Sequence, residues 1–371
     1  GYPGSGVQKT DSEKGLRGSK EAFSESVKMN TALIRKRIRN AKMKAEEKQV
    51  GRYSATTTAL LYLDGVVYQP ICEEMRKRLN AFEVDGIEDS GMIEYLTRKK
   101  KEGRFPVYQT TERPDRAAQA ILEGRVVLLT DNSPEALIFP ATLNSLFQTA
   151  DDYYRNERIV TFLRLIRYVA AFLALALPGL YVAAATFHPQ LLPGNLIRSM
   201  AEARSGVPFP TAAEVLLMEL SFELLREAGL RMPGPAGNTI GIVGGLIVGQ
   251  AAVSANLVSP ITVTVAALTA LGSFSIPNEE LSEVFRLWKY GILLLGSCFG
   301  ILGVMLGCFL LLMLMAEQES YGIPWLYPYV GGNLNERADE KDSMFLAAAR
   351  KRKRRPIFAK WGNRIRFRRK S

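Results

Sequence analysis

The chain has 371 residues, a formal net charge of +11 at pH 7 and 47% hydrophobic residues. Twelve of its 48 Lys and Arg residues lie in 350–371, which contains no acid, and the remaining 36 face 37 acidic residues elsewhere. A globally basic surface is therefore excluded, and we expect no nucleic-acid partner. The first half is charged throughout, whereas the second half contains three long runs without charge.

Residues 1–55 predict an N-terminal segment with a basic docking helix. Within 20–48, apolar residues fall roughly along one side of a helix, and basic residues lie beside them. The apolar positions are Phe23, Val27, Leu33, Ile34 and Ile38, and the basic ones are Arg35, Lys36, Arg37 and Arg39. We expect this helix to dock by its apolar side.

Residues 56–150 predict a small α/β domain. Three short apolar runs suit buried strands, and two stretches have helical spacing: strands within 58–65, 125–131 and 135–140, helices within 70–81 and 89–101. A further helix runs from about Pro114 to Glu123, with Thr111 as its cap and Gly124 just past its end. No phosphate loop, nucleophile beside a base or metal-ligand spacing occurs, so we expect no catalytic site, cofactor or metal.

Residues 151–328 predict a helical membrane domain. Because a span needs about 20 apolar residues, the charge-free runs accommodate four spans, at about 168–187, 236–255, 260–276 and 290–316. A re-entrant hairpin in the middle run, with two full spans, is the alternative. Basic residues precede the first span and fill the tail, 329–371, so both ends are expected on the cytoplasmic side, the tail touching anionic lipid. The basic residues before the first span are Arg155, Arg158, Arg164 and Arg167.

An amphipathic helix is expected at 211–229, between the first two spans. Thr211 and Glu214 form a capping-box pattern, and Gly229 ends the helix. Glu219 and Glu223 share one face with Arg226 and Glu227, while leucines cover most of the rest. Either this helix lies in the membrane interface with a solvated face, or Glu219 and Glu223 form an acidic mouth to a cation path.

Residues 234–260 carry no charge, yet they place polar side chains and glycines on opposite sides of a helix. One stripe holds Thr239, Val243, Leu246, Gln250 and Ser254, and the other side includes Gly241, Gly244, Gly245 and Gly249. The glycine side is expected to pack against protein. The polar stripe then makes contacts between helices or lines a pore, and spacing alone does not choose between these.

The last span carries a second set of glycines, which predicts another packing seam: Gly296, Gly300, Gly303 and Gly307. Four spans give too little wall to enclose a pore within one protomer. Conduction would therefore require a homo-oligomer.

The stretch "EVLLMELSFELLREAGLRMPGPAGNTIGIVGGLIVGQAAVSANLVSP" resembles the signature region of spore germination receptor A subunits, the GerA family. Other similar stretches include "TTERPDRAAQAILEGRVVLLTDNSPEALIFPAT" and "YGIPWLYP", and the resemblance covers most of Arg17–Pro328. Compared with the family pattern, the chain is expected to lack the first N-terminal subdomain.

The resemblance implies a non-enzymatic subunit of a nutrient (germinant) receptor in the spore inner membrane, with both termini on the core side. It implies a transporter-like B subunit and a lipoprotein C subunit as partners. It also implies oligomerisation around a gated monovalent-cation path. Two alternatives stay open: a scaffold that conducts nothing, and a receptor paralogue that amplifies ion release without sensing nutrient.

Overall fold

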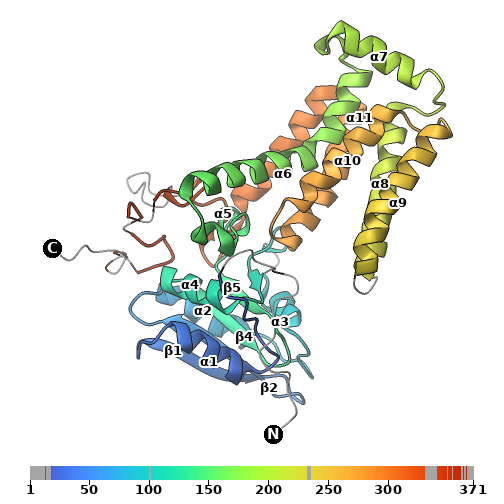
Figure 1. The fold of residues 1–371 in the computed structure, drawn as a ribbon. Coiled ribbons are helices and arrows are strands. Elements are labelled where there is room, and N and C mark those ends of the chain that lie inside the picture. The colour runs from blue at the N-terminus through green and yellow to red at the C-terminus, as the bar shows by residue number, and fades with distance from the viewer. Residues whose placement is uncertain are drawn as a thin grey trace. The chain divides into compact units, whose positions relative to one another are not determined.

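The computed structural model describes residues 13, 18–99, 102–231, 235–330, 341–360 without 349 and 353, 362 and 365; for 235–243 and 246 it describes the backbone only. The chain divides into two compact units (Figure 1). Residues 1–165 and 314–371 form one, called here the α/β unit, and residues 166–313 form the other, the helical unit.

The α/β unit is built on a five-stranded sheet in which all neighbouring strands are antiparallel. The strand order is β1-β2-β4-β5-β3. The strands are β1 Met43–Val50, β2 Thr56–Leu63, β3 Gln109–Thr111, β4 Val126–Thr130 and β5 Ala136–Phe139. Strand side chains alternate between two faces, and both faces of β2 and β4 are apolar, so the sheet needs a covering layer on each side.

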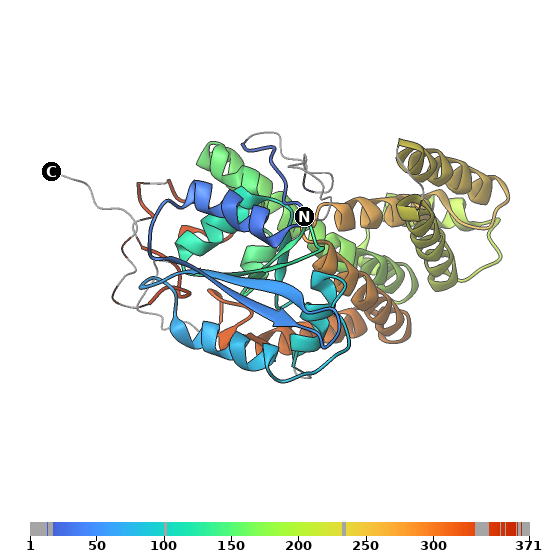
Figure 2. The same cartoon turned by 90° about the horizontal axis from the view of Figure 1, so that it is seen from below.

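Helices cover both faces of this sheet (Figure 2). On one face, α1 (Val27–Arg37) and α4 (Pro114–Glu123) pack on Leu61 and Leu129. On the other, α2 (Gln69–Leu79) and α3 (Ser90–Thr97) pack on Leu60. The expected apolar side of the N-terminal helix is buried against the sheet and α4 of its own unit.

Three predicted strands and three predicted helices of the α/β unit occur close to their expected positions. Gly124 ends α4 in the left-handed conformation, with φ 93°, which glycine adopts without steric cost. Thr111 does not cap the helix, because its hydroxyl accepts the amide N–H of Arg113, the residue before α4 begins. The helix expected within 20–48 is too long: it ends at Arg37, and β1 follows.

The described part of the C-terminal segment, up to residue 360, belongs to the α/β unit rather than forming a separate tail from residue 329. Trp325 is fully buried and donates a hydrogen bond from Nε1 to Pro106 O at 2.7 Å. Phe358 joins the hydrophobic core on which α2 packs, and the Lys360 amide donates to Val66 O at 2.7 Å. The short strands β6 (Glu319–Ser320) and β7 (Ile323–Pro324) lead into this segment.

The remaining elements are helical. Within the α/β unit, α5 spans Leu143–Leu146 and a 3-10 turn spans Ala150–Tyr154; a second 3-10 turn, Pro189–Leu191, lies in the helical unit. The long helices are α6 Glu157–Thr186, α7 Gly194–Arg204, α8 Thr211–Arg231, α9 Pro235–Ser254, α10 Pro260–Phe274 and α11 Glu279–Glu317. The boundary between the units falls inside α6 and inside α11.

The last predicted span is not one helix, because α11 is broken at Gly300. That residue has φ 63° and ψ −144°, a region open essentially to glycine. A Cβ at Gly307 would lie 2.9 Å from Cγ1 of Ile292, although 15 residues of straight helix would separate the two by about 22 Å. The two arms, 279–299 and 301–317, therefore fold back on each other as a hairpin.

The four-span arrangement is not established. Among the described residues, α6 alone is both long and apolar enough to cross a membrane, and the apolar helices 260–274 and 301–317 are shorter. One of the basic residues expected to flank the first span has another role. Arg164 is buried and paired with Asp152 at 3.1 Å and Asp342 at 2.9 Å.

Candidate functional site in the helical unit

Helix α8 turns its charged side inward and its leucines outward. Glu214 and Glu219 are 0% and 2% exposed, whereas Leu224 is 71% exposed. Further leucines on the outer side are also exposed: Leu216, Leu217, Leu220 and Leu230. The solvated acidic face expected for an interfacial helix is therefore absent at these two glutamates.

Glu214 holds together three elements at one end of the site. Its Oε1 accepts from Nε of Arg204 in α7 at 3.1 Å. Its Oε2 accepts from the Ser259 amide at 2.9 Å and from the Thr262 hydroxyl at 3.1 Å, at the start of α10. These hydrogen bonds replace the hydration that the fully buried carboxylate has lost, and so they stabilise its charge.

Further along α8, three ion pairs connect it to the first arm of α11. Glu219 accepts from Lys289 Nζ at 2.6 Å, and Glu223 pairs with Arg286. Arg226 pairs with Glu279 at 3.4 Å and lies over the ring of Phe274. The two helices run antiparallel, because residues later in α8 pair with residues earlier in α11. The acidic mouth proposed for Glu219 and Glu223 is thus occupied by cationic side chains of the same chain.

The polar stripe of α9 can be followed at two positions. Gln250 and Ser254 are exposed, and they line one groove of about 1360 Å³ together with Glu219 and Lys289. Three other members, Thr239, Val243 and Leu246, have side chains outside the described residues. The structure therefore brings the two described members of the stripe into the same groove as a buried ion pair.

The glycines of α9 lie against the neighbouring helices α8 and α10. A Cβ atom added to Gly244, Gly245 or Gly249 would come close to a side chain of one of these helices. At Gly244 it would lie 2.7 Å from Cδ2 of Leu225 in α8, and at Gly249 it would lie 3.2 Å from Cγ1 of Val263 in α10. At Gly245 the nearest atom is Cε1 of Phe222, at 3.3 Å. The surroundings of Gly241 are not among the described parts of the structure.

The glycines of α11 serve the hairpin instead of one continuous helix face. A Cβ at Gly296 would lie 2.8 Å from Val304 Cγ2 and 3.0 Å from the carbonyl oxygen of Gly179 in α6. At Gly303 it would lie 2.0 Å from the carbonyl oxygen of Leu295. Gly300 is the break itself. Backbone approach as close as this requires residues without side chains.

The site contains carboxylates, ammonium and guanidinium groups, but no arrangement of metal ligands. Across the described part of the chain, no three His, Cys, Asp or Glu side chains are placed to hold a metal ion. The arrangement can hold charge within an otherwise apolar helix bundle, and it can release a carboxylate to the groove if a pair separates.

Comparison with known proteins identifies the family. A model described as the Bacillus/Clostridium GerA spore germination protein matches residues 1–358. The chain belongs to the GerA family. Among its relatives, the Uncharacterized membrane protein YfkQ of Bacillus subtilis (strain 168) is 39% identical over 342 residues, covering 92% of this chain and 66% of YfkQ.

Two further GerA relatives are named for germination. Spore germination protein A1 of Bacillus subtilis (strain 168) is 39% identical, covering 85% of this chain and 66% of that protein. Spore germination protein KA of the same organism is 37% identical, with 87% and 59% covered. The chain thus spans 59% to 66% of the length of these three relatives. The crystal structure of the N-terminal domain of the A subunit of the Bacillus megaterium spore germinant receptor GerK3 is 33% identical over 33% of this chain, with a TM-score of 0.26.

Sequence reasoning on this GerA chain missed the basic partners of α8. The helical pattern of the sequence does not identify Arg204, Arg286 and Lys289 as these partners. A signal was available, because 279–289 repeats acids and bases at helical spacing beside a charge-free run. Which acid meets which base depends on how the helices pack, and spacing within one helix does not contain that information.

Proposed function

We propose that this chain is a membrane subunit of a germinant receptor and that its helical unit, assembled from several copies, forms a gated path for monovalent cations. The observation that carries the proposal is the reversed polarity of α8, with Glu219 buried and Leu224 exposed. In water the opposite arrangement is stable. Ionisable groups that face a bundle interior and pair with one another are typical of membrane helices.

The exposed side chains in the rest of the helical unit also support an environment of lipid. Large apolar side chains are exposed on α10 and on both arms of α11: Leu268, Leu271, Leu287, Leu294, Phe299, Leu302, Met305, Phe309 and Leu312. Burying such surface in hydrocarbon is favourable by about 25 cal/mol per Å². Helix α6 meets the length and composition of a span, and the relative YfkQ is named a membrane protein.

The groove supports a polar route through this unit. Gln250 and Ser254 offer an amide and a hydroxyl, and Glu219 and Glu223 contribute to the same lining. With both acids paired, the route would lack a free carboxylate. Separation of α8 from the first arm of α11 would return the carboxylates to the groove, and a cation path would then open.

The family relationship supports the remaining parts of the proposal. We assign a transporter-like B subunit and a lipoprotein C subunit as partners, with the α/β unit transmitting or restraining gating. The basic residues at the start of α6 and in 350–371 favour a cytoplasmic, core-side location for both termini in the spore inner membrane.

Potassium flux from liposomes tests the path. The purified chain is reconstituted as wild type, as Gln250→Leu and as Ser254→Ala, with Ser221→Ala as control. Ser221 donates its hydroxyl to Leu217 O within its own helix, so its loss leaves the groove unchanged. We expect reduced flux in the two groove variants and wild-type flux in the control. Equal flux in all four proteins would reject this lining.

A non-conducting scaffold is the second candidate, and the ion pairs of Glu219 with Lys289 and of Glu223 with Arg286 favour it. The test uses Gln250→Cys and Ser254→Cys after replacement of the native cysteines, of which Cys298 is exposed. Labelling by a membrane-impermeant thiol reagent from water supports the path. Protection of both positions in the assembled receptor supports the scaffold.

A further inference from the structure

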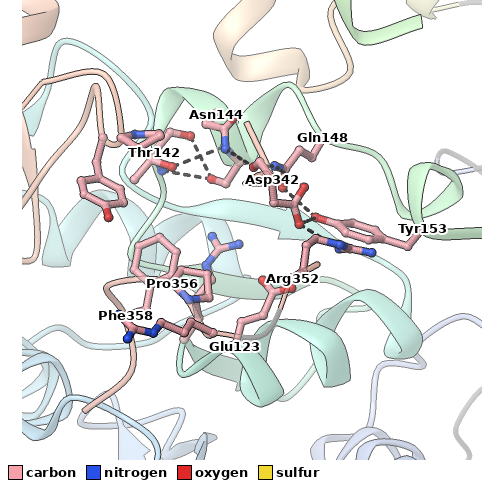
Figure 3. A pocket seen from close by; sticks show the side chains of 14 residues that line it. Glu123, Thr142, Asn144, Gln148, Tyr153, Asp342, Arg352, Pro356 and Phe358 are labelled. Carbon is pink, nitrogen blue, oxygen red and sulfur yellow. Dashed lines mark hydrogen bonds and ion pairs between the residues drawn. The ribbon is translucent and has the colours of Figure 1, made fainter. Parts of the chain in front are cut away.

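A small pocket of about 50 Å³ lies in the α/β unit, whereas the site described above belongs to the helical unit. The end of α4, the region around α5, and the C-terminal segment form its walls (Figure 3). Tyr153, Asp342 and Arg352 line one side of it, and Pro356 and Phe358 line the other. Since a water needs about 10–15 Å³ by this measure, the pocket has room for a few waters or one ligand of similar size.

Arg125 is the unusual wall residue, because it is a buried cation that forms no ion pair with a carboxylate among the described residues. It is 5% exposed. Its Nε donates to Pro140 O at 3.0 Å and its Nη1 donates to Gln109 Oε1 at 2.9 Å, both uncharged acceptors. Its Nη2 has no hydrogen-bond partner among the described residues. Burial lowers the pKa of Arg125 to about 10, which reflects the cost of holding this charge away from water.

The acids of the pocket do not form an ion pair with Arg125. Asp342 accepts from Arg352 at 3.1 Å and from Arg164 at 2.9 Å, so its charge is already matched by two guanidiniums. The lining as a whole holds three guanidiniums, from Arg125, Arg352 and Arg354, against the carboxylates of Glu123 and Asp342. An excess of one positive charge is left in the lining.

We propose that this pocket binds a small monocarboxylate, whose carboxylate pairs with the guanidinium of Arg125 and whose short apolar body lies against Pro356 and Phe358. A monoanion balances the lining, whereas a phosphate dianion would exceed it. Guanidinium and carboxylate groups match in geometry and form strong charge-assisted hydrogen bonds. The apolar wall gives no partner to the further oxygens of a tetrahedral anion.

The position of the pocket gives the ligand a structural consequence. Arg352, Pro356 and Phe358 all come from the C-terminal segment, while Arg125 is the residue immediately before β4. A ligand held between them connects that segment to the sheet. Binding therefore stabilises the docked segment and protects the basic residues of 350–355 from trypsin.

Calorimetric titration of the full chain in detergent with sodium acetate, at constant ionic strength, tests the proposal. Sodium phosphate is the comparison ligand. Arg125→Lys keeps the charge but loses the planar fork, and we expect acetate to bind about tenfold more weakly or worse. Glu123→Gln removes an acid from the lining and leaves the bonds of Arg125 in place, so we expect tighter binding. Arg158→Gln, an exposed change in the same unit, serves as control and should match the wild type.

The outcomes separate clearly. Saturable acetate binding, weakened by Arg125→Lys, strengthened by Glu123→Gln and accompanied by trypsin protection, supports the site. Absence of acetate binding to the wild type overturns it, and so does tighter binding of phosphate than of acetate. If Arg125→Lys fails to fold, an affinity unchanged in Glu123→Gln is sufficient to reject the pocket as the binding site.

Discussion

Glu219 of α8 and Lys289 of α11 form a buried ion pair at 2.6 Å, on the side of α8 that faces away from its exposed leucines. The pair lies at the groove that Gln250 and Ser254 also line. A charge at this position is stable only while its partner is present. The contact between α8 and α11 therefore depends on both charges being present.

The first prediction concerns that pair. Lys289→Met leaves Glu219 buried without a counterion, and we expect a loss of about 3–5 kcal/mol in unfolding free energy. The double variant Glu219→Leu with Lys289→Met removes both charges and should recover most of the loss. Unfolding of the purified chain in detergent, followed by circular dichroism, measures the cycle.

An exposed pair on the same helix provides the control for this cycle. Arg231 and Glu227 pair at 2.6 Å, but both side chains are exposed. Arg231→Met should change stability little, since surface pairs contribute little. A double variant as unstable as Lys289→Met alone would show that the charge itself is not the cause.

The second prediction concerns the hairpin of α11. Gly303→Ala places a Cβ 2.0 Å from the carbonyl oxygen of Leu295, a backbone atom that cannot rotate away. We expect the two arms to separate and the helical unit to lose at least about 3 kcal/mol, because overpacking at backbone contact exceeds the usual 1–3 kcal/mol. A cysteine pair across the arms, at Ile292 and Gly307, would report the separation by loss of disulfide formation.

Gly291→Ala is the matched change in the same helix. A Cβ there meets no atom within 4 Å. Alanine favours helix over glycine by about 0.8–1.0 kcal/mol, so this variant should be as stable as the wild type or slightly more stable. Equal behaviour of Gly291→Ala and Gly303→Ala would contradict the hairpin.

Local signals made part of the fold predictable. The limits of α4 follow from Pro114 at its start and Gly124 after its end, and both act within the helix itself. The strands β2, β4 and β5 follow from short apolar runs. In contrast, β1 carries Glu46, Glu47 and Lys48, which favour a helix locally, and it is a strand because it pairs with β2 along its whole length. Pairing of that kind is not visible within one segment.

The candidate site shows the same division. The separation of glycines from the polar stripe on α9 follows from a helical period. The break at Gly300 does not, since a glycine seam on a straight helix and a glycine hairpin share the same spacing. The burial of Glu219 could not be predicted either. An acidic stripe beside leucines is compatible with water on the charged side or with lipid on the apolar side.

The third prediction concerns Glu135, next to the turn between β4 and β5. Burial raises the pKa of this carboxyl, and nearby acids such as Asp89 and Glu112 raise it further. The pKa of Glu135 is therefore higher in the folded state than in the unfolded state, where it is near 4.5. The contribution of this group to stability is fully present below the unfolded-state pKa and is lost as the pH rises through the folded-state pKa. Glu135→Gln should therefore raise the melting temperature at pH 7 and have little effect at pH 4. A larger gain at pH 4 than at pH 7 would contradict this account.

The fourth prediction concerns the docking of the C-terminal segment at Gly124. This residue has φ 93°, and a Cβ on it would lie 2.8 Å from Cα and 2.9 Å from N of Ala359. Gly124→Ala therefore combines a left-handed alanine, which costs about 1–2 kcal/mol, with a backbone clash against the segment. We expect the segment to detach, which would expose Phe358, and trypsin to cleave within 350–355 at least tenfold faster, as about 1.4 kcal/mol of lost docking corresponds to a factor of ten.

Gly86→Ala is the control in the same unit, since its nearest neighbour, Cβ of Ser54, would lie at an ordinary 3.4 Å. Cleavage at the wild-type rate in Gly124→Ala would mean that the segment is held elsewhere, because Ala359 could not keep its place beside an added methyl group.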